Sequence, residues 1–153
     1  SSTCALRLRQ RFGYVFAGQF GYPTIVELKT LDNARMHGGI AFRGVEMPHG
    51  PTQTTGYRFE CDGKSIVYAT DFSEITDAML RLFDGVDLLV TDCLRRDPHP
   101  THAHLEMALE LGRKTGAGQV VLSHLDKSMD YVPMTEETPD NVLVGFDGME
   151  LAA

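Results

Sequence analysis

Apolar and polar residues form only weak patterns in the first part of the chain. Over residues 3–12, apolar side chains are interspersed with three arginines, which predicts a short amphipathic helix. Several glycines and Pro23 predict a loop after it. Apolar and charged residues alternate over residues 24–31, which is typical of a partly exposed strand. Residues 39–47 predict a further strand, which Pro48 is expected to end.

The middle of the chain has a clearer pattern. Residues 56–61 and 64–71 are rich in residues that favour strands. Asp62 and Gly63 lie between these two runs, and this dipeptide is a strong signal for a tight β-hairpin. Residues 75–82 then place their apolar side chains at helical spacing, so we expect a helix to follow the hairpin.

The rest of the chain alternates between strand and helix patterns. Two continuous apolar runs, residues 86–92 and 119–124, predict strands that are buried on both faces. Residues 104–115 between them have helical periodicity. Residues 136–139 predict a turn, and residues 142–151 predict a final strand or hairpin. This alternation is typical of an α/β fold in which helices cover a sheet.

Composition and charge narrow the class of protein. The chain has 153 residues, enough for one domain with a buried core. Its net charge of -7 argues against a nucleic-acid partner, because phosphate backbones are bound by clustered lysines and arginines. Cys4, Cys61 and Cys93 are far apart, which favours reduced thiols in a cytoplasmic protein. No apolar run approaches the length of about 20 residues that spans a membrane.

Three residues able to bind a metal follow predicted strands directly. They are His49, Asp71 and His124. If these strands are neighbours, the three side chains converge at one edge of the sheet. Imidazole and carboxylate ligands together suit zinc, manganese or iron. The ordinary alternatives stay open at this point: Asp71 also fits a helix N-cap, and a single histidine after a strand is usually a surface or core residue.

Several segments together resemble a known family. They are PHGPTQTTGYRFE, SIVYATDFSE, VDLLVTDCLR, HPTHAHLEMALEL and QVVLSHLDKSMDY. In this order they resemble the later motifs of the metallo-β-lactamase-fold hydrolases. The resemblance is strongest to the branch that contains phosphoribosyl cyclic phosphodiesterase and ribonuclease Z, and it covers nearly all residues from Ile40 onward. It implies a four-layer αββα sandwich, of which this chain would hold the C-terminal part.

The resemblance also implies roles for individual residues. That family binds two metal ions. His49 would bind one ion, Asp71 would bridge both, and His124 would bind the other. His102 falls where the phosphodiesterase and ribonuclease branch has a histidine that assists phosphoester cleavage. The alternative for His102 is a solvent-facing residue at the start of a helix.

Four further residues have weaker assignments. His99 and Arg95 could contact a substrate phosphate, although a solvated histidine and a solvated arginine are the ordinary alternatives. Asp92 is expected to orient a histidine from behind, or else to cap the end of its strand. His104 lies two positions after His102, and we expect it at the surface.

One part of the family pattern does not occur here. The signature His-x-His-x-Asp-His, which supplies metal ligands in the N-terminal half of the fold, is absent from the sequence. We therefore expect residues 1–153 to form a single, incomplete domain that holds the C-terminal part of a longer protein. The alternative is a natural half-domain that acts as a non-catalytic binding or assembly module. No glycine-rich phosphate loop follows a predicted strand, so a nucleotide-binding module has little support.

These expectations define a function for the complete protein. It would be a metal-dependent phosphodiesterase with two divalent ions, zinc or manganese, acting on a small cyclic nucleotide or cyclic sugar phosphate. The chain alone is expected to be inactive and to hold metal poorly or not at all. It should also self-associate through an apolar sheet face. The residues expected on this face are Val67, Leu88, Val90, Val121 and Leu122.

Overall fold

The computed structural model describes residues 2–18, 20–29 and 34–151. The chain divides into two compact units, Ser1–Arg35 and Met36–Ala153. None of the helices in these described ranges has both the length and the apolar character that a membrane crossing requires.

Within its described residues, the first unit contains helix α1 (Ser2–Ala17), residues 20–29, which form no helix or strand, and residues 34–35, which begin the first strand. The predicted helix is confirmed, and it continues past Gly13 after a break in helical geometry at Phe12. The strand predicted over residues 24–31 is wrong for the described residues, because residues 24–29 form no strand. Ile25 instead donates its backbone N–H to the carbonyl of Val15 (3.1 Å), so the segment bonds to the helix rather than to a sheet. Residues 30 and 31 lie outside the described residues.

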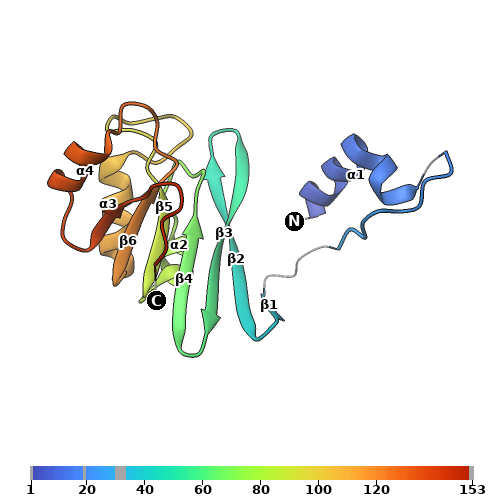
Figure 1. Cartoon of the computed structure of the whole chain (residues 1–153), viewed down its shortest axis with the longest axis horizontal. Helices are drawn as coiled ribbons and strands as arrows, with labels where there is room; N and C mark the ends of the chain where they lie inside the picture. The colour runs from blue at the N-terminus through green and yellow to red at the C-terminus, as the bar shows by residue number, and fades with distance from the viewer. Residues whose placement is uncertain (1, 19, 30–33, 152–153) are drawn as a thin grey trace. The chain divides into compact units, whose positions relative to one another are not determined.

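The second unit is built on a mixed sheet (Figure 1). Its seven strands in the described part of the chain follow each other across the sheet in sequence order. The antiparallel part carries the predicted hairpin and the parallel part carries the strands that alternate with helices. The bounds are β1 (Ala34–His37), β2 (Ile40–His49), β3 (Thr52–Cys61), β4 (Lys64–Ala69), β5 (Leu88–Asp92), β6 (Gln119–Ser123) and β7 (Val142–Val144).

Strand β2 is longer than the pattern predicted. It continues through Pro48, which pairs with Gln53, and ends at His49. A proline is tolerated in a strand where its missing N–H does not interrupt the ladder. This extension places His49 at the end of the strand, beside the turn into β3.

Three helices accompany this sheet: α2 (Asp77–Phe83), α3 (Leu105–Thr115) and α4 (Tyr131–Glu137). Helices α2 and α3 were predicted, and their ends have clear causes. Thr76 caps α2 by accepting the N–H of Met79 at 3.2 Å. Gly116 ends α3 in the left-handed conformation, with φ of 61°.

The segment after β6 differs from the prediction. Helix α4 was not expected, and the turn predicted over residues 136–139 is the end of this helix. The final strand is confirmed as β7, but no hairpin follows it. Gly145 donates its N–H to the carbonyl of Leu122 (2.9 Å), and residues 146–151 form no helix or strand.

The two faces of the sheet differ in how they are covered. Helix α2 contacts β2 and β3, and α3 contacts β5 and β6. On the helix-covered face Val67, Leu89 and Leu122 are fully buried. Val67 and Leu122 therefore do not belong to the open apolar face, which corrects the prediction for these two residues. The reason is the two-residue period of a strand, because neighbouring residues point to opposite faces.

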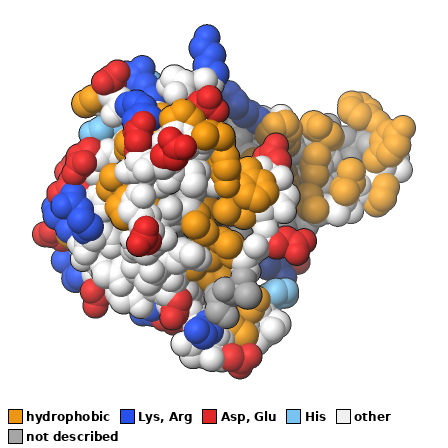
Figure 2. Space-filling view, turned by 60° about the vertical axis from the view of Figure 1, so that its left-hand side comes forward, with side chains coloured by type: hydrophobic (Ala, Val, Ile, Leu, Met, Phe, Trp, Pro, Cys, Tyr) orange, Lys and Arg blue, Asp and Glu red, His pale blue; other side chains and the backbone are white. Residues whose placement is uncertain are grey.

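The opposite face carries the residues that alternate with this core. Across β4 and β5, Ile66 pairs with Leu88 and Tyr68 pairs with Val90, and these side chains point to the opposite face. Tyr68 is 47% exposed. Leu88 and Val121 lie on the same face but are only 8% and 6% exposed. Figure 2 shows apolar side chains gathered in a band over the face of the molecule in view.

Candidate metal centre

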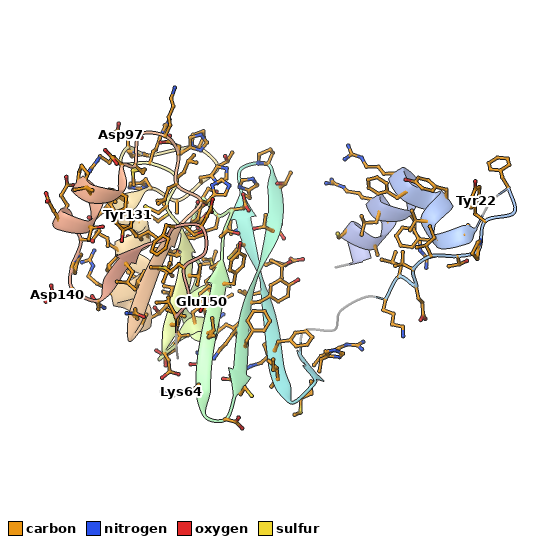
Figure 3. All side chains as sticks on the ribbon, viewed as in Figure 1. Tyr22, Lys64, Asp97, Tyr131, Asp140 and Glu150 are labelled. Atoms are coloured by element: carbon orange, nitrogen blue, oxygen red, sulfur yellow. The ribbon has the colours of Figure 1, made fainter. Side chains whose placement is uncertain are left out.

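Four polar residues lie at one edge of the sheet. His49 ends β2, Asp71 follows β4, Asp92 ends β5 and His124 follows β6. Strands β2, β4, β5 and β6 all run in the same direction, so their carboxyl ends meet at this edge. In Figure 3 this end of the sheet carries Asp97, and Lys64 at the start of β4 lies at the other end. In open α/β sheets, ligands usually bind at the edge formed by the carboxyl ends of the parallel strands.

Asp71 lies at the centre of this group. Its Oδ1 is 3.8 Å from Nε2 of His124 and 3.7 Å from Nδ1 of His102. Ligand atoms of His49, Asp71 and His102 all lie within 4.8 Å of one another, as do those of Asp92, His102 and His124. The structure thus brings together the three predicted ligands and the predicted catalytic histidine. His102 was predicted as a catalytic residue and not as a ligand. It nevertheless lies inside the cluster, with Nδ1 3.7 Å from Oδ1 of Asp71.

The histidine rings pack against each other. The rings of His102 and His124 are stacked with centroids 4.8 Å apart, and the ring of His49 meets His102 edge-on at 4.7 Å. Their nitrogens therefore converge on a small volume beside the Asp71 carboxylate, instead of pointing to separate parts of the surface.

Asp92 anchors the site from inside the protein. Its carboxylate is fully buried, and Oδ2 accepts hydrogen bonds from the backbone N–H groups of Phe72 and Ala103, both at 3.3 Å. The same oxygen lies 3.0 Å from Nδ1 of His102. Since an ionised carboxylate only accepts, Nδ1 of His102 carries the proton in this bond and Nε2 is left as the free nitrogen. The predicted orienting role of Asp92 thus has a direct contact in the structure.

The other oxygen of this carboxylate has no hydrogen-bond partner among the described residues. Asp92 Oδ1 is buried, and Nδ1 of His124 lies 3.6 Å from it. A buried carboxylate oxygen without a partner is costly. Together with the imidazole and carboxylate donors, it makes the edge well suited to a bound cation such as zinc or manganese.

His49 is oriented by the backbone of a distant loop. Its Nδ1 lies 2.7 Å from the carbonyl oxygen of Thr101. A carbonyl oxygen can only accept, so the neutral ring has its proton on Nδ1 and an unprotonated Nε2. An unprotonated nitrogen is the form of histidine that binds a metal, and a carbonyl behind the ring is a frequent way to fix it.

Two of the candidate ligands have unusual backbone conformations. Asp71 has φ of 62° and His124 has φ of 60°, both in the left-handed region that non-glycine residues rarely adopt. The hydroxyl of Thr54 donates to the carbonyl of Asp71 at 2.7 Å and helps to hold it there. Strain of this kind concentrates at functional sites, where the surrounding structure maintains it.

The loop after β5 carries the weaker candidates. Arg95 donates from Nε to the carbonyl of Asp97 (3.2 Å) and from Nη2 to the carbonyl of Pro98 (2.7 Å). His99 lies within the same loop, with its ring centroid 5.2 Å from that of His102. Burial and the positive charge of Arg95 lower the pKa of His99 below its usual range. Both predicted substrate contacts therefore lie on the loop that presents His102.

Two features of this loop were missed or misplaced by the sequence patterns. Thr101 was not singled out, because it acts on His49 through a main-chain oxygen that every residue type has. His104, expected at the surface, is the N-cap residue of α3, and its Nδ1 is buried without a hydrogen-bond partner among the described residues.

The turn after β2 makes a close contact with this loop. Gly50 has φ of 57°, and a Cβ at this position would lie 2.5 Å from Cγ2 of Thr101. Gly50→Ala is therefore expected to destabilise the protein by about 1–3 kcal/mol, through the clash and the left-handed backbone. Thermal unfolding measures the effect. Adding Thr101→Ser removes the clashing methyl group and should restore part of the loss. No recovery in the double variant would contradict the clash.

Comparison with known proteins places this arrangement in a family. The sequence matches the family described as the beta-lactamase superfamily domain over residues 1–125. A putative ribonuclease Z of Mycobacterium tuberculosis (strain CDC 1551 / Oshkosh) is 31% identical over 108 residues, which is 62% of this chain and 45% of that protein. Among solved structures, a diphosphatase from the PhnP family superimposes with a TM-score of 0.80 at 31% identity, covering 94% of this chain and 52% of that chain.

A more distant structure agrees in fold. YhfI from Bacillus subtilis, a metallo-β-lactamase fold protein, superimposes with a TM-score of 0.74 at 19% identity, over 92% of this chain and 60% of that chain. The α/β sheet with its carboxylate and histidine cluster thus has the metallo-β-lactamase fold. Since the family match covers most of its length, the chain belongs to the metallo-β-lactamase-fold hydrolases. It spans about half or less of the ribonuclease Z and diphosphatase relatives.

Proposed function

We propose that this chain is the C-terminal part of a two-metal phosphodiesterase that acts on a small cyclic nucleotide or cyclic sugar phosphate. Support comes from relatives that are named as ribonuclease Z and as a diphosphatase, since both names refer to reactions at phosphorus. The coverage of the relatives and the missing His-x-His-x-Asp-His signature support an incomplete domain.

The donor set defines how the chain would hold metal. His49, with its free Nε2, would bind one ion, Asp71 would bridge two, and His124 would bind the second. Zinc or manganese fits such ligands. When bound, two such ions supply Lewis acidity, which eases the ionisation of water and neutralises charge on a phosphate.

The hydrogen-bonded pair of Asp92 and His102 is the observation that carries the proposal. The bond of 3.0 Å fixes the His102 ring, which stacks on the ring of His124 with centroids 4.8 Å apart and lies within the cluster of ligand atoms. A protonated imidazole held in this way can give its proton to the alkoxide that leaves phosphorus, and the buried carboxylate stabilises the imidazolium. This is the arrangement of a general acid with an orienting partner.

Charge favours a small substrate over a folded RNA. The chain carries 14 lysines and arginines against 21 aspartates and glutamates. A surface with this balance does not attract an extended phosphate backbone. Arg95 and His99 supply local polar groups near the site, which suffice for a single phosphate. We therefore propose a small phosphorylated molecule as the partner.

The test is hydrolysis by the full-length protein that contains this chain. A suitable panel contains a 2′,3′-cyclic nucleotide, a cyclic ribose phosphate, bis(p-nitrophenyl) phosphate, an RNA with a 3′ extension, a lactone and a thioester. We expect turnover of the cyclic phosphates that is lost on chelation and restored by zinc or manganese. Preferential cleavage of the lactone or the thioester would contradict the assignment to phosphodiesters, and preferential cleavage of the RNA would contradict the small substrate.

The chain of 153 residues by itself is expected to lack activity and to bind metal weakly. Its three proposed ligands leave most positions around two ions to water, and weakened support typically lowers metal affinity by about another 10–100-fold. Metal analysis after dialysis against zinc measures occupancy, and light scattering measures the expected self-association. Stoichiometric, tightly bound metal in a monomeric chain would contradict both expectations.

A further inference from the structure

The loop that follows β5 is closed at its base by the backbone. Leu94 donates its N–H to the carbonyl of Ala103, and Leu105 donates to the carbonyl of Arg95, both at 2.9 Å. The side chain of Arg95 then reaches forward to the carbonyls of Asp97 and Pro98. The segment between these bonds carries His99 and His102, so both rings are presented by a loop that is fixed at its base and along its length.

The hydrogen bonds of His99 determine which of its nitrogens carries the proton. The backbone N–H of Thr101 donates to Nδ1 of His99 at 3.3 Å, and the Thr101 hydroxyl lies 3.2 Å from the same nitrogen. A backbone N–H cannot accept, so Nδ1 must be the unprotonated nitrogen. The neutral ring therefore carries its proton on Nε2. The lowered pKa of His99, caused first by desolvation and then by Arg95, agrees with a neutral ring.

This Nε2–H group has no hydrogen-bond partner in the described part of the chain. It is not one of the buried polar atoms without a partner. The ring that carries it lies 5.2 Å from the ring of His102. His99 therefore offers a free hydrogen-bond donor beside the candidate metal centre.

We propose that His99 is a substrate-positioning residue whose Nε2–H donates to a phosphoryl oxygen, and that Thr101 sets the tautomer that makes this possible. This inference rests on the proposed function and adds a specific contact to it. A neutral donor can bind an anionic oxygen without adding a positive charge to a site that holds cations. A hydrogen bond to a charged group contributes a factor of about 10–100 in binding.

The tautomer is measured first, in the chain as it stands and without metal or substrate. Long-range ¹H–¹⁵N correlation spectra distinguish a histidine protonated on Nδ1 from one protonated on Nε2. We expect His99 to be the Nε2–H tautomer in the wild type and in Thr101→Ser, which keeps the hydroxyl. Thr101→Val is similar in shape and keeps the backbone N–H but lacks the hydroxyl, so the Nε2–H tautomer should remain the major form with a smaller population than in the wild type. A wild-type ring protonated on Nδ1 would overturn the inference.

The substrate contact is tested by a matched pair of variants in the full-length, metal-loaded protein. In His99→Gln the side-chain amide can reach the position of Nε2, whereas in His99→Asn it reaches only the position of Nδ1. With bis(p-nitrophenyl) phosphate as the probe, we expect His99→Asn to raise KM by about 10–100-fold. His99→Gln should keep most of the wild-type KM, and both variants should keep their metal.

The possible results separate this inference from the proposed function. Equal losses in His99→Asn and His99→Gln would indicate a structural role and overturn it. Loss of metal in His99→Asn would make His99 a ligand and also overturn it. A metal-loaded wild type that hydrolyses no phosphodiester would overturn the proposed function together with the contact. An active wild type with an unaffected His99→Asn would overturn the contact alone.

Discussion

Replacing His102 by alanine in the full-length protein should lower kcat by about 10²–10⁴-fold, the range typical for removal of a general acid or base. His102 lies 3.0 Å from Asp92 and 3.7 Å from Asp71, so its loss removes the proton donor proposed for the leaving alkoxide. Metal content should change little, because His49, Asp71 and His124 remain. Steady-state kinetics and metal analysis measure the two effects separately.

His37→Ala provides the matched control for this variant. His37 is an exposed histidine on β1 and belongs to neither candidate ligand cluster. The control should keep the wild-type kcat. Since His102 lies inside the cluster of ligand atoms, loss of a metal ion in His102→Ala is the result that would make it a ligand. That result would contradict the role proposed here.

Asp92→Asn should lower kcat by about 10²–10⁴-fold as well, for a different reason. The serine-protease triad offers a precedent, in which changing the aspartate to asparagine leaves the histidine in the wrong tautomer. The amide must also face the N–H groups of Phe72 and Ala103, which need an acceptor. We therefore expect a loss of about 1–3 kcal/mol in the free energy of unfolding. Kinetics and thermal unfolding are both required.

Asp87→Asn is the control that separates stability from catalysis. Asp87 also accepts hydrogen bonds from a backbone N–H and a hydroxyl, those of Ser65, but it lies before β5 at the other end of the strand. This variant should lose some stability and keep its kcat. If Asp92→Asn lost activity only in proportion to its stability, the proposed orientation of His102 by Asp92 would be contradicted.

The sequence patterns predicted most of the second unit because local and long-range signals agree there. Asp62 and Gly63 occupy the turn between β3 and β4, and both have positive φ, as a tight hairpin turn requires. The continuous apolar runs became the parallel strands β5 and β6. A continuous apolar run does not show which side of a buried strand the helices cover. Val67 and Leu122 were therefore assigned to the wrong face.

The errors occurred where the local pattern was short or misleading. Helix α4 was missed because a helix of seven residues is too short to show a clear helical periodicity. Alternation over residues 24–29 suggested a strand, but alternation does not provide a partner strand, and the segment pairs with α1 at Ile25 instead.

The candidate site was predictable to the extent that it follows strand ends. His49, Asp71 and His124 could be selected because each comes directly after a strand pattern, and the structure brings them together. Their roles as ligands stay predictions that depend on the family resemblance. Thr101 could not be found in this way, since its contact with His49 and one of its two contacts with His99 use main-chain atoms.

Oδ2 of Asp92 takes part in three hydrogen bonds, and this affects the dynamics of the site. This oxygen joins the segment after β4, at Phe72, to the loop before α3, at Ala103, from a position on the buried strand β5. The amide protons of Phe72 and Ala103 should therefore exchange with solvent only when the sheet itself opens. Hydrogen exchange at Phe72 and Ala103 should be as slow as at the core amides of β5, although both residues belong to loops. The edge that carries the candidate metal centre would then open and close as one cooperative unit with the core, without an independent local fluctuation.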